Sequence, residues 1–431
     1  MPGKRVYTES FGCPSNQFDL EVMMGQLEDE GYTFVDEAEE SDVILVNTCG
    51  VKKPTEDKIL YRLQRLRELK KPVLVTGCLP KIDFPALQKA IPSNVAYLDP
   101  FTINQISVAL AQLVQDKRTT RYFTEVAPLK LTMHKLHPNK IVEIVPISEG
   151  CLGRCTFCCT RFARGHLFSY PPQLIVDAIQ QSIARGRQEI WITAQDTGAY
   201  GKDRNSDLPT LLEIICTLKG DFHLRVGMMN PNHVPNILDN LIDAFQHDKI
   251  FKFLHLPIQS GNDQVLQCMN RQCHITDFKR VVHAFRAKIP QLTLSTDVIC
   301  GFPSEDDRAF QDTVRLLEEI EPDIVNISKF APRPNTLAAT MKQLPSQLVK
   351  ARSKQLTTHC KTIALRKNRR WIKWQGSILV DEIGRPGSVI GRNFAYKPVV
   401  ITGKRELLGK HVPVEITSAT PTYLLGEATT S

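Results

Sequence analysis

No stretch of this sequence approaches the roughly 18–20 consecutive apolar residues that a membrane-spanning helix needs. Its start, Met1-Pro-Gly-Lys-Arg, lacks the pattern of a signal peptide and leads directly into an expected strand. Internal repeats and low-complexity tracts are also absent. We therefore expect a soluble, cytoplasmic protein with no membrane partner.

Positive charge exceeds negative charge only slightly. The chain has 54 Lys and Arg residues and 46 Asp and Glu residues, which gives a net charge of +8. This excess fits a nucleic-acid partner but does not establish one. Cysteine, in contrast, is plentiful, with 12 residues. In a reducing compartment such cysteines are more often metal ligands or catalysts than disulfides. The length of 431 residues predicts two to three domains.

Short apolar runs alternate with helical stretches in the first 120 residues. Strands are expected at 4–10, 42–47 and 71–76, and helices at 19–30 and 57–70. This alternation predicts a parallel sheet with helices on its faces. The polar, basic segment 115–140 is typical of a linker.

Six more strands follow with a different spacing, at 142–148, 189–194, 222–227, 252–258, 292–299 and 323–330. Amphipathic helices lie between them, for example at 172–185 and 310–320. This pattern suits a partial (β/α)6 barrel, in which chemistry takes place on the loops after the strands. From about Trp371, short strands broken by Gly and Pro predict a small β-barrel. The expected fold class is α/β, with an N-terminal sheet, a central partial barrel and a C-terminal β-barrel.

Three cysteines follow the first strand of the central barrel in a CxxxCxxC pattern, Cys151, Cys155 and Cys158. Closed zinc and iron–sulfur sites use four protein ligands, so three thiolates on a cubane cluster leave one iron open. This arrangement resembles that of radical S-adenosylmethionine (SAM) enzymes, in which SAM fills the open position. A zinc loop with a distant fourth ligand and three reduced structural thiols are the alternatives.

A second set of cysteines, Cys13, Cys49 and Cys78, comes from the N-terminal sheet, where each follows an expected strand. The carboxyl ends of parallel strands share one edge, so the three can converge there. Three separately buried cysteines are the alternative, since free cysteine is among the most buried residue types. We favour a second three-thiolate cluster.

The order of these motifs resembles that of the methylthiotransferases of the radical-SAM superfamily, over nearly the whole chain. The resemblance is carried by Gly12-Cys13 with Asn16 and Asp19, Asn47-Thr48-Cys49, Gly77-Cys78, Cys151–Cys158, Ala163-Arg164-Gly165, His255–Gly261, Thr296–Pro303 and Pro332-Arg333-Pro334. Asp196–Asp203 and Met229-Asn230-Pro231 are most similar to the archaeal and eukaryotic branch. That branch acts on tRNA carrying N6-threonylcarbamoyladenosine at position 37.

The resemblance implies domains at 1–120 (methylthiotransferase, auxiliary cluster), 137–365 (radical SAM) and 370–431 (a TRAM-like RNA-binding domain). It implies two [4Fe-4S] clusters, SAM, an electron donor and the anticodon loop of tRNA as partners. A SAM-derived radical would take the hydrogen from C2 of the modified adenine, a C–H bond that no side-chain base can deprotonate. The auxiliary cluster would hold or donate sulfur, which a second SAM methylates.

SAM contacts are expected where the barrel strands end, and Arg333 between two prolines is a further candidate. The strand-end candidates are Gln195, Asp196, Thr197, Gln259, Ser260, Asp297 and Gly301. Loop capping or turn geometry is the alternative for each. His255 is expected to face the barrel interior, where it could equally be a histidine of the core or a residue that contacts the cofactor.

Polar side chains for the threonylcarbamoyl carboxylate would come from Arg161, Arg164, Asn230, Asn232 and His233. RNA contacts would come from basic and aromatic residues of the C-terminal segment. They are Arg366, Lys367, Arg369, Arg370, Trp371, Lys373, Trp374, Arg392, Phe394, Tyr396, Lys397, Lys404 and Arg405.

Three positions depart from the family pattern. Ser304 and Asn335 stand where glycine is common, and Cys159 adds a thiol beside Cys158. One alternative interpretation is an enzyme that catalyses the same reaction on another substrate, either isopentenyladenosine tRNA or an aspartate of ribosomal protein S12. A rival of another class is a zinc-containing RNA-binding protein without turnover.

Overall fold

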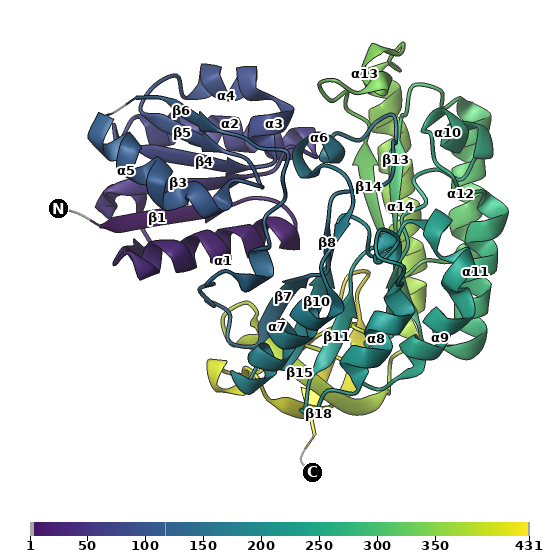
Figure 1. The fold of residues 1–431 in the computed structure, drawn as a ribbon. Helices are drawn as coiled ribbons and strands as arrows, with labels where there is room; N and C mark the ends of the chain where they lie inside the picture. Colours follow the sequence, from purple (N-terminus) through teal and green to yellow (C-terminus); the bar gives the residue numbers. More distant parts are fainter. Residues whose placement is uncertain (1–3, 117, 430–431) are drawn as a thin grey trace.

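The computed structural model describes residues 4–116 and 118–429. Met1 to Gly3, which precede the first expected strand, lie outside the described residues. Three bodies follow one another along the chain: an N-terminal sheet, a central barrel and a small C-terminal barrel (Figure 1).

The N-terminal body is a six-stranded parallel sheet in the order β2-β1-β3-β4-β5-β6. Its strands are β1 (Arg5–Ser10), β2 (Thr33–Val35), β3 (Val43–Thr48), β4 (Val73–Gly77), β5 (Val95–Leu98) and β6 (Thr120–Tyr122). Its helices are α1 (Pro14–Asp29), α2 (Lys53–Arg67), α3 (Leu79–Ile82), α4 (Phe84–Ala90) and α5 (Ile106–Asp116).

The sheet is apolar on both faces because successive side chains of a strand point to opposite sides. On β3, Val43 and Leu45 pack with the core that α1 and α5 cover. Ile44 and Val46 pack on the other face with residues of α2 and α4. The predicted parallel sheet is thus confirmed.

Two details differ from the sequence-based expectation. Helix α1 begins at Pro14, five residues before the expected start, because a proline in the first turn has its φ already set for a helix. The segment 115–140 is no loose linker: it contributes β6 to the sheet and buries Lys130 and Lys135 among carboxylates. Two of its basic side chains thus form buried ion pairs, whereas Arg118, Arg121 and Lys140 are exposed.

The central body contains six parallel strands that alternate with helices, in two sheets ordered β11-β10-β7 and β12-β13-β14. A bridge from Leu224 to Ile250 links the two sheets. The strands are β7 (Val142–Pro146), β10 (Glu189–Thr193), β11 (His223–Val226), β12 (Phe253–His255), β13 (Thr293–Cys300) and β14 (Ile324–Lys329). The main helices are α7 (Pro172–Ala184), α8 (Leu208–Cys216), α9 (Leu238–Gln246), α11 (Ile275–Lys288), α12 (Asp307–Ile320) and α14 (Ser346–Arg369).

Shorter elements line the loops of this body. They are β8 (Ser148–Glu149), β9 (Phe168–Ser169), α6 (Thr160–Arg164), α10 (Asp263–Cys268) and α13 (Leu337–Thr340). Among the described residues, β7 and β14 do not pair with each other, so the barrel stays open on that side. The predicted partial (β/α)6 barrel is confirmed.

The C-terminal body is a closed barrel in the order β15-β16-β17-β19-β18. Its strands are β15 (Gln375–Ile383), β16 (Ser388–Arg392), β17 (Pro398–Thr402), β18 (His411–Ala419) and β19 (Leu424–Ala428). It packs under the amino-terminal ends of the central strands, where the Lys252 amide donates to the Phe394 carbonyl at 2.8 Å.

This packing corrects part of the expected RNA surface. Trp371 lies in the core of the C-terminal barrel, and Trp374 and Phe394 pack against it. Tyr396 and Lys397 are buried against the central barrel, where Lys397 pairs with Asp323 at 2.8 Å. Trp371, Tyr396 and Lys397 are therefore buried and not free to contact RNA, whereas Trp374 and Phe394 are only partly buried.

No helix in the described part of the chain combines the length and the apolar character needed to cross a membrane.

Candidate active site between the sheet and the barrel

A cavity of about 920 Å³ lies where the central strands end. Cys151, Cys155 and Cys158 all line it. The loop that carries them is shaped by Gly150, whose φ is +74° and whose missing Cβ would lie 1.9 Å from the His166 carbonyl oxygen. Only glycine fits this position, so the backbone places Cys151 directly at the mouth of the barrel.

The cysteine loop is held by its own hydrogen bonds. The Gly153 amide donates to the Cys151 Sγ at 3.2 Å, and the Cys158 amide donates to the Cys155 carbonyl at 3.1 Å. Burial raises the pKa of Cys151 to about 12, and the neighbouring Asp196 carboxylate adds to this shift. The free thiol therefore keeps its proton at neutral pH, whereas a bound metal ion would displace it.

Cys159 points away from the other three thiols. Its side chain is 1% exposed, and its Sγ donates to the Gly50 carbonyl at 3.3 Å, against the N-terminal sheet. It is absent from the cavity wall, whereas Cys158 is part of it. This placement favours Cys158 as the third residue of the triad.

The second cysteine set also converges as its strand positions predicted. Strands β1, β3 and β4 are neighbours in register, with Ser10 opposite Asn47 and Thr48 opposite Gly77. Cys49 and Cys78 are buried while Cys13 is exposed, and the thiols are close enough to influence each other's ionisation. Burial raises the pKa of Cys78 to about 12, although the positive charge of the nearby Arg164 guanidinium lowers it in part.

Arg164 joins the two cysteine sets through a buried ion network. Its side chain, 1% exposed, pairs with Asp19 at 2.7 Å and Glu149 at 3.1 Å. Lys130 bridges the same two carboxylates at 2.7 and 2.8 Å. Arg164 also donates to the Asn16 Oδ1 at 2.6 Å. The expectation that Arg164 meets the substrate carboxylate is wrong, because its guanidinium is buried and already paired with two acids.

The spacing of the thiols tests which metal the triads fit. Of the residues that the structure describes, only Asp221, His223 and His411 bring three ligand atoms within 4.8 Å of one another. Each cysteine triad therefore includes at least one wider Sγ pair. A single Zn²⁺ binds thiolates at about 2.3 Å, so they would sit roughly 4 Å apart around it. In a multi-iron cluster each thiolate binds a different iron and the sulfurs lie farther apart, so a wider Sγ pair is compatible with a cluster.

Three of the predicted SAM contacts line the same cavity as the cysteine triad: Gln195, Asp196 and Gln259. Gln195 accepts from the Gly150 amide at 2.7 Å and reaches the Ser15 hydroxyl at 3.3 Å. It thus spans the loop of one cysteine set and the helix after Cys13.

Asp196 is buried, and burial raises the pKa of its carboxyl to about 6. One carboxylate oxygen accepts from the amides of Gly198 and Asn230 at 3.1 and 2.9 Å. The other, Oδ2, is buried without a hydrogen-bond partner and lies 3.5 Å from His233. Asp196 thus lines the cavity with a carboxylate whose Oδ2 is buried on the side of His233.

Five other predicted contacts lie off this wall. Thr197 donates to carbonyls of Gly227 and Met228, and Ser260 is buried and accepts from the Asn262 amide. Asp297 pairs with His255 at 3.3 Å, and the Gly301 amide donates to Glu305. Arg333 pairs with Glu56 of the N-terminal sheet. All five stay predictions, and their contacts here are those of structural residues.

The expected substrate contacts are likewise divided. Arg161 and Asn230 line the cavity, whereas His233 is buried beside Lys202 at 2.7 Å. Sequence reasoning missed Arg271, which lines the cavity near Cys155, where burial raises the pKa of the thiol and the charge of Arg271 opposes that shift. It lies in the short segment between α10 and α11, and the fold brings it to the cysteines.

The departures from the family pattern are also explained. Asn335 has a φ of +62°, a left-handed conformation that asparagine tolerates. Ser304 is not among the described residues with positive φ, so serine suits its position without strain.

The comparisons with known proteins agree with this arrangement. Uncharacterized protein family UPF0004 matches residues 5–98, the Radical SAM superfamily matches 145–317, and the TRAM domain matches 377–429. A probable threonylcarbamoyladenosine tRNA methylthiotransferase of Pyrococcus abyssi is 41% identical over 98% of this chain and 99% of its own length. The human threonylcarbamoyladenosine tRNA methylthiotransferase is 35% identical over 99% of this chain and 74% of its own.

The chain belongs to the threonylcarbamoyladenosine tRNA methylthiotransferase family. Solved structures support the fold alone. The radical S-adenosylmethionine methyltransferase TsrM from Kitasatospora setae has a TM-score of 0.56 at 13% identity, over 78% of this chain and 77% of that one. The cobalamin-dependent S-adenosylmethionine radical enzyme OxsB has a TM-score of 0.52 at 10% identity, over 83% and 56%.

Proposed function

We propose that this member of the family is a radical-SAM enzyme that converts N6-threonylcarbamoyladenosine at tRNA position 37 into its 2-methylthio derivative. The proposal rests on two groups of three cysteines, between which Arg164 and its ion pairs lie. One group lines a cavity that is large enough for SAM and a nucleoside. The domains would be 1–120, 137–365 and 370–431.

Six thiolates would hold two [4Fe-4S] clusters: Cys151, Cys155 and Cys158 for the SAM-binding one, and Cys13, Cys49 and Cys78 for the auxiliary one. When bound, the first cluster would supply the electron for reductive cleavage of SAM, and with it the radical chemistry that the C2–H bond requires; an external donor would provide that electron. Asp196 would contact the SAM ammonium from the cavity wall. Gln195 and Gln259 would contact SAM from the same wall.

The threonylcarbamoyl group ends in a carboxylate, so its site should offer a cation. Arg161 is the proposed partner because it lines the cavity and is only partly buried, and Asn230 would add a donor from the facing loop. An isopentenyl group would instead call for an apolar wall. This polarity favours the threonylcarbamoyl substrate.

RNA binding by the C-terminal barrel would use the basic residues that remain exposed. Among the expected residues these include Arg369, Lys373, Lys404 and Arg405. They neutralise phosphates irrespective of base sequence, so binding should weaken as salt rises. Removing the whole barrel is a poor test of RNA binding, because it would also remove Lys397 and leave Asp323 of the central barrel without this partner.

The substrate is tested by giving the reconstituted enzyme threonylcarbamoyladenosine tRNA, isopentenyladenosine tRNA and ribosomal protein S12, with mass spectrometry of the products. We expect methylthiolation of the first. Preference for either rival would refute the substrate while leaving the radical mechanism intact.

The ligand assignment is tested by alanine replacement of adjacent thiols. Cys158→Ala should abolish reductive SAM cleavage, since a cluster held by two thiolates is bound too weakly to present an open iron. Cys159→Ala should retain most activity, because this thiol faces Gly50. An inactive Cys159→Ala beside an active Cys158→Ala would overturn the assignment.

A further inference from the structure

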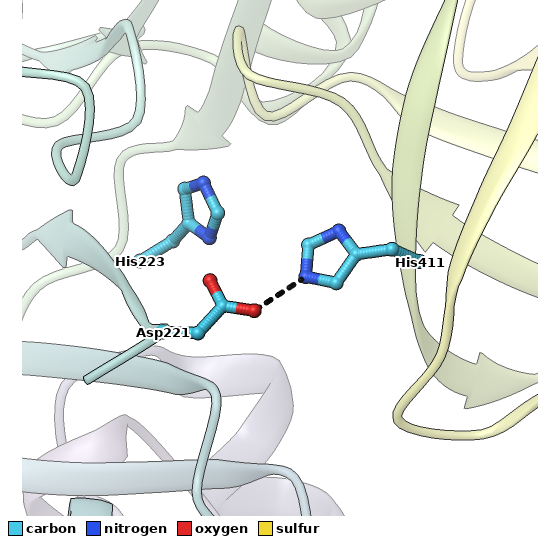
Figure 2. A group of neighbouring side chains, drawn as sticks. All are labelled: Asp221, His223 and His411. Atoms are coloured by element: carbon cyan, nitrogen blue, oxygen red, sulfur yellow. Dashed lines mark ion pairs between the residues drawn. The ribbon is translucent and has the colours of Figure 1, made fainter.

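A group of potential metal ligands lies at the end of the molecule opposite to the cavity. Asp221 and His223 stand at the amino-terminal end of β11, whereas Met228 and Asn230, after its carboxyl end, line the cavity. His411 begins β18 of the C-terminal barrel. Figure 2 shows these side chains converging from the two barrels. None of them belongs to the proposed active site.

The three ligand atoms all lie within 4.8 Å of one another. His411 Nε2 is 3.6 Å from Asp221 Oδ2, and the two imidazole rings are 5.9 Å apart. Ligands of one metal ion at about 2.0–2.2 Å lie roughly 3–4 Å apart, so only a small closure is needed. Asp221 can supply it, because its side chain is 74% exposed and free to move.

His223 gives a second, independent sign of a ligand. Its Nδ1 atom is buried, and no described residue offers it a hydrogen bond. The ring itself is fixed by stacking on Phe251 at 5.1 Å, and its backbone amide donates to the Gln188 carbonyl at 2.8 Å. A buried polar atom without a partner is costly, and metal coordination would satisfy it.

We propose that Asp221, His223 and His411 bind one zinc ion that ties the C-terminal barrel to the central barrel. Two imidazoles and one carboxylate form a donor set that zinc accepts, with water in the fourth position. Calcium and magnesium prefer oxygen ligands throughout, so the two histidines argue against them. The ion would fix the RNA-binding barrel against the catalytic barrel without entering the reaction.

The test uses the reconstituted full-length enzyme with both clusters loaded, so that the six cysteines do not compete for zinc. One equivalent of zinc is added, and X-ray absorption is recorded at the zinc edge, which is separate from that of iron. We expect nitrogen and oxygen neighbours at about 2.0–2.2 Å. Sulfur neighbours near 2.3 Å would place the zinc on cysteines and overturn the proposal.

Two variants locate the ion. Asp221→Asn, at an exposed position, and His411→Ala should each weaken zinc binding at least tenfold, as measured by competition with a chelator. Zinc should also raise the melting temperature of the wild-type enzyme but not of these variants. His274→Ala is the matched control, because His274 lies 3.8 Å from Asp263 in an exposed pair without a third ligand. Unchanged affinity in both Asp221→Asn and His411→Ala would refute the site.

Discussion

Two arginines three residues apart illustrate how burial separates residues that look alike in the sequence. Arg161 is partly exposed and lines the cavity, whereas Arg164 is enclosed by Asp19, Glu149 and Asn16. Both were equal candidates for the substrate carboxylate. The carboxylates that bind Arg164 lie up to 145 residues away along the chain, so no local pattern could identify them.

Replacing each arginine by methionine should therefore give opposite results. Arg164→Met leaves Asp19 and Glu149 with Lys130 as their one remaining cation, and should cost about 3–5 kcal/mol of stability. Arg161→Met should change stability by less than about 0.5 kcal/mol and instead impair turnover on modified tRNA.

Urea unfolding and single-turnover assays of the same preparations separate the two effects. If Arg164→Met proved as stable as the wild type, the buried network would not hold the sheet to the barrel. If Arg161→Met turned over normally, the carboxylate would have another partner.

At the scale of elements, the strand ends were predictable and the contacts between bodies were not. Strands β1, β3 and β4 are marked by local apolar runs, and parallel geometry alone places Cys13, Cys49 and Cys78 on one edge. The burial of Lys130 and Lys135 within 115–140 does not follow from the sequence, because their partners Asp19 and Glu21 are distant along the chain. Basic and aromatic residues near Tyr396 suggested RNA for the same reason: composition does not distinguish an interface from a surface.

The end of β4 depends on a glycine. Gly77 has a φ of +92°, and a Cβ there would lie 2.2 Å from the Thr48 carbonyl oxygen. Gly77→Ala must therefore displace the backbone that carries Cys78. We expect a loss of more than about 2 kcal/mol of stability, together with a lower iron content at the auxiliary site.

Gly186→Ala is the matched control. Gly186 has a φ of +80° but no atom within 4 Å of its would-be Cβ, so only backbone strain of about 1–2 kcal/mol applies. Its iron content should equal that of the wild type. Equal iron loss in both variants would show that strain alone, rather than the contact with Thr48, disturbs Cys78.

The whole molecule is held together by buried polar contacts between its bodies. Arg164 and Arg333 link the N-terminal sheet to the central barrel, through Asp19 and Glu56. Tyr396 and Lys397 link the C-terminal barrel to it, through Glu189 and Asp323. Each body has its own hydrophobic core. A buried ion pair or hydrogen bond forms only when both partners are correctly placed, so these contacts fix how the bodies are oriented relative to one another.

Glu189 makes one of these contacts sensitive to pH. Its Oε1 accepts from the Tyr396 hydroxyl at 3.0 Å, while its Oε2 is buried without a partner. Burial, together with the nearby Asp381 carboxylate, raises the pKa of Glu189 from 4.5 to about 7. The folded chain thus retains a proton that the unfolded chain loses between these pH values.

Since the folded state binds more protons in this window, the free energy of unfolding should fall as the pH rises from about 4.5 to about 7. The difference amounts to about 3 kcal/mol at 1.36 kcal/mol per pH unit. Glu189→Gln cannot ionise, so it should flatten the profile and exceed the wild type in melting temperature at pH 8. Calorimetry across the pH series checks this, with exposed Glu213→Gln as the control for loss of one charge. Parallel profiles for the wild type and Glu189→Gln would contradict the idea that this carboxyl stays protonated where the two barrels meet.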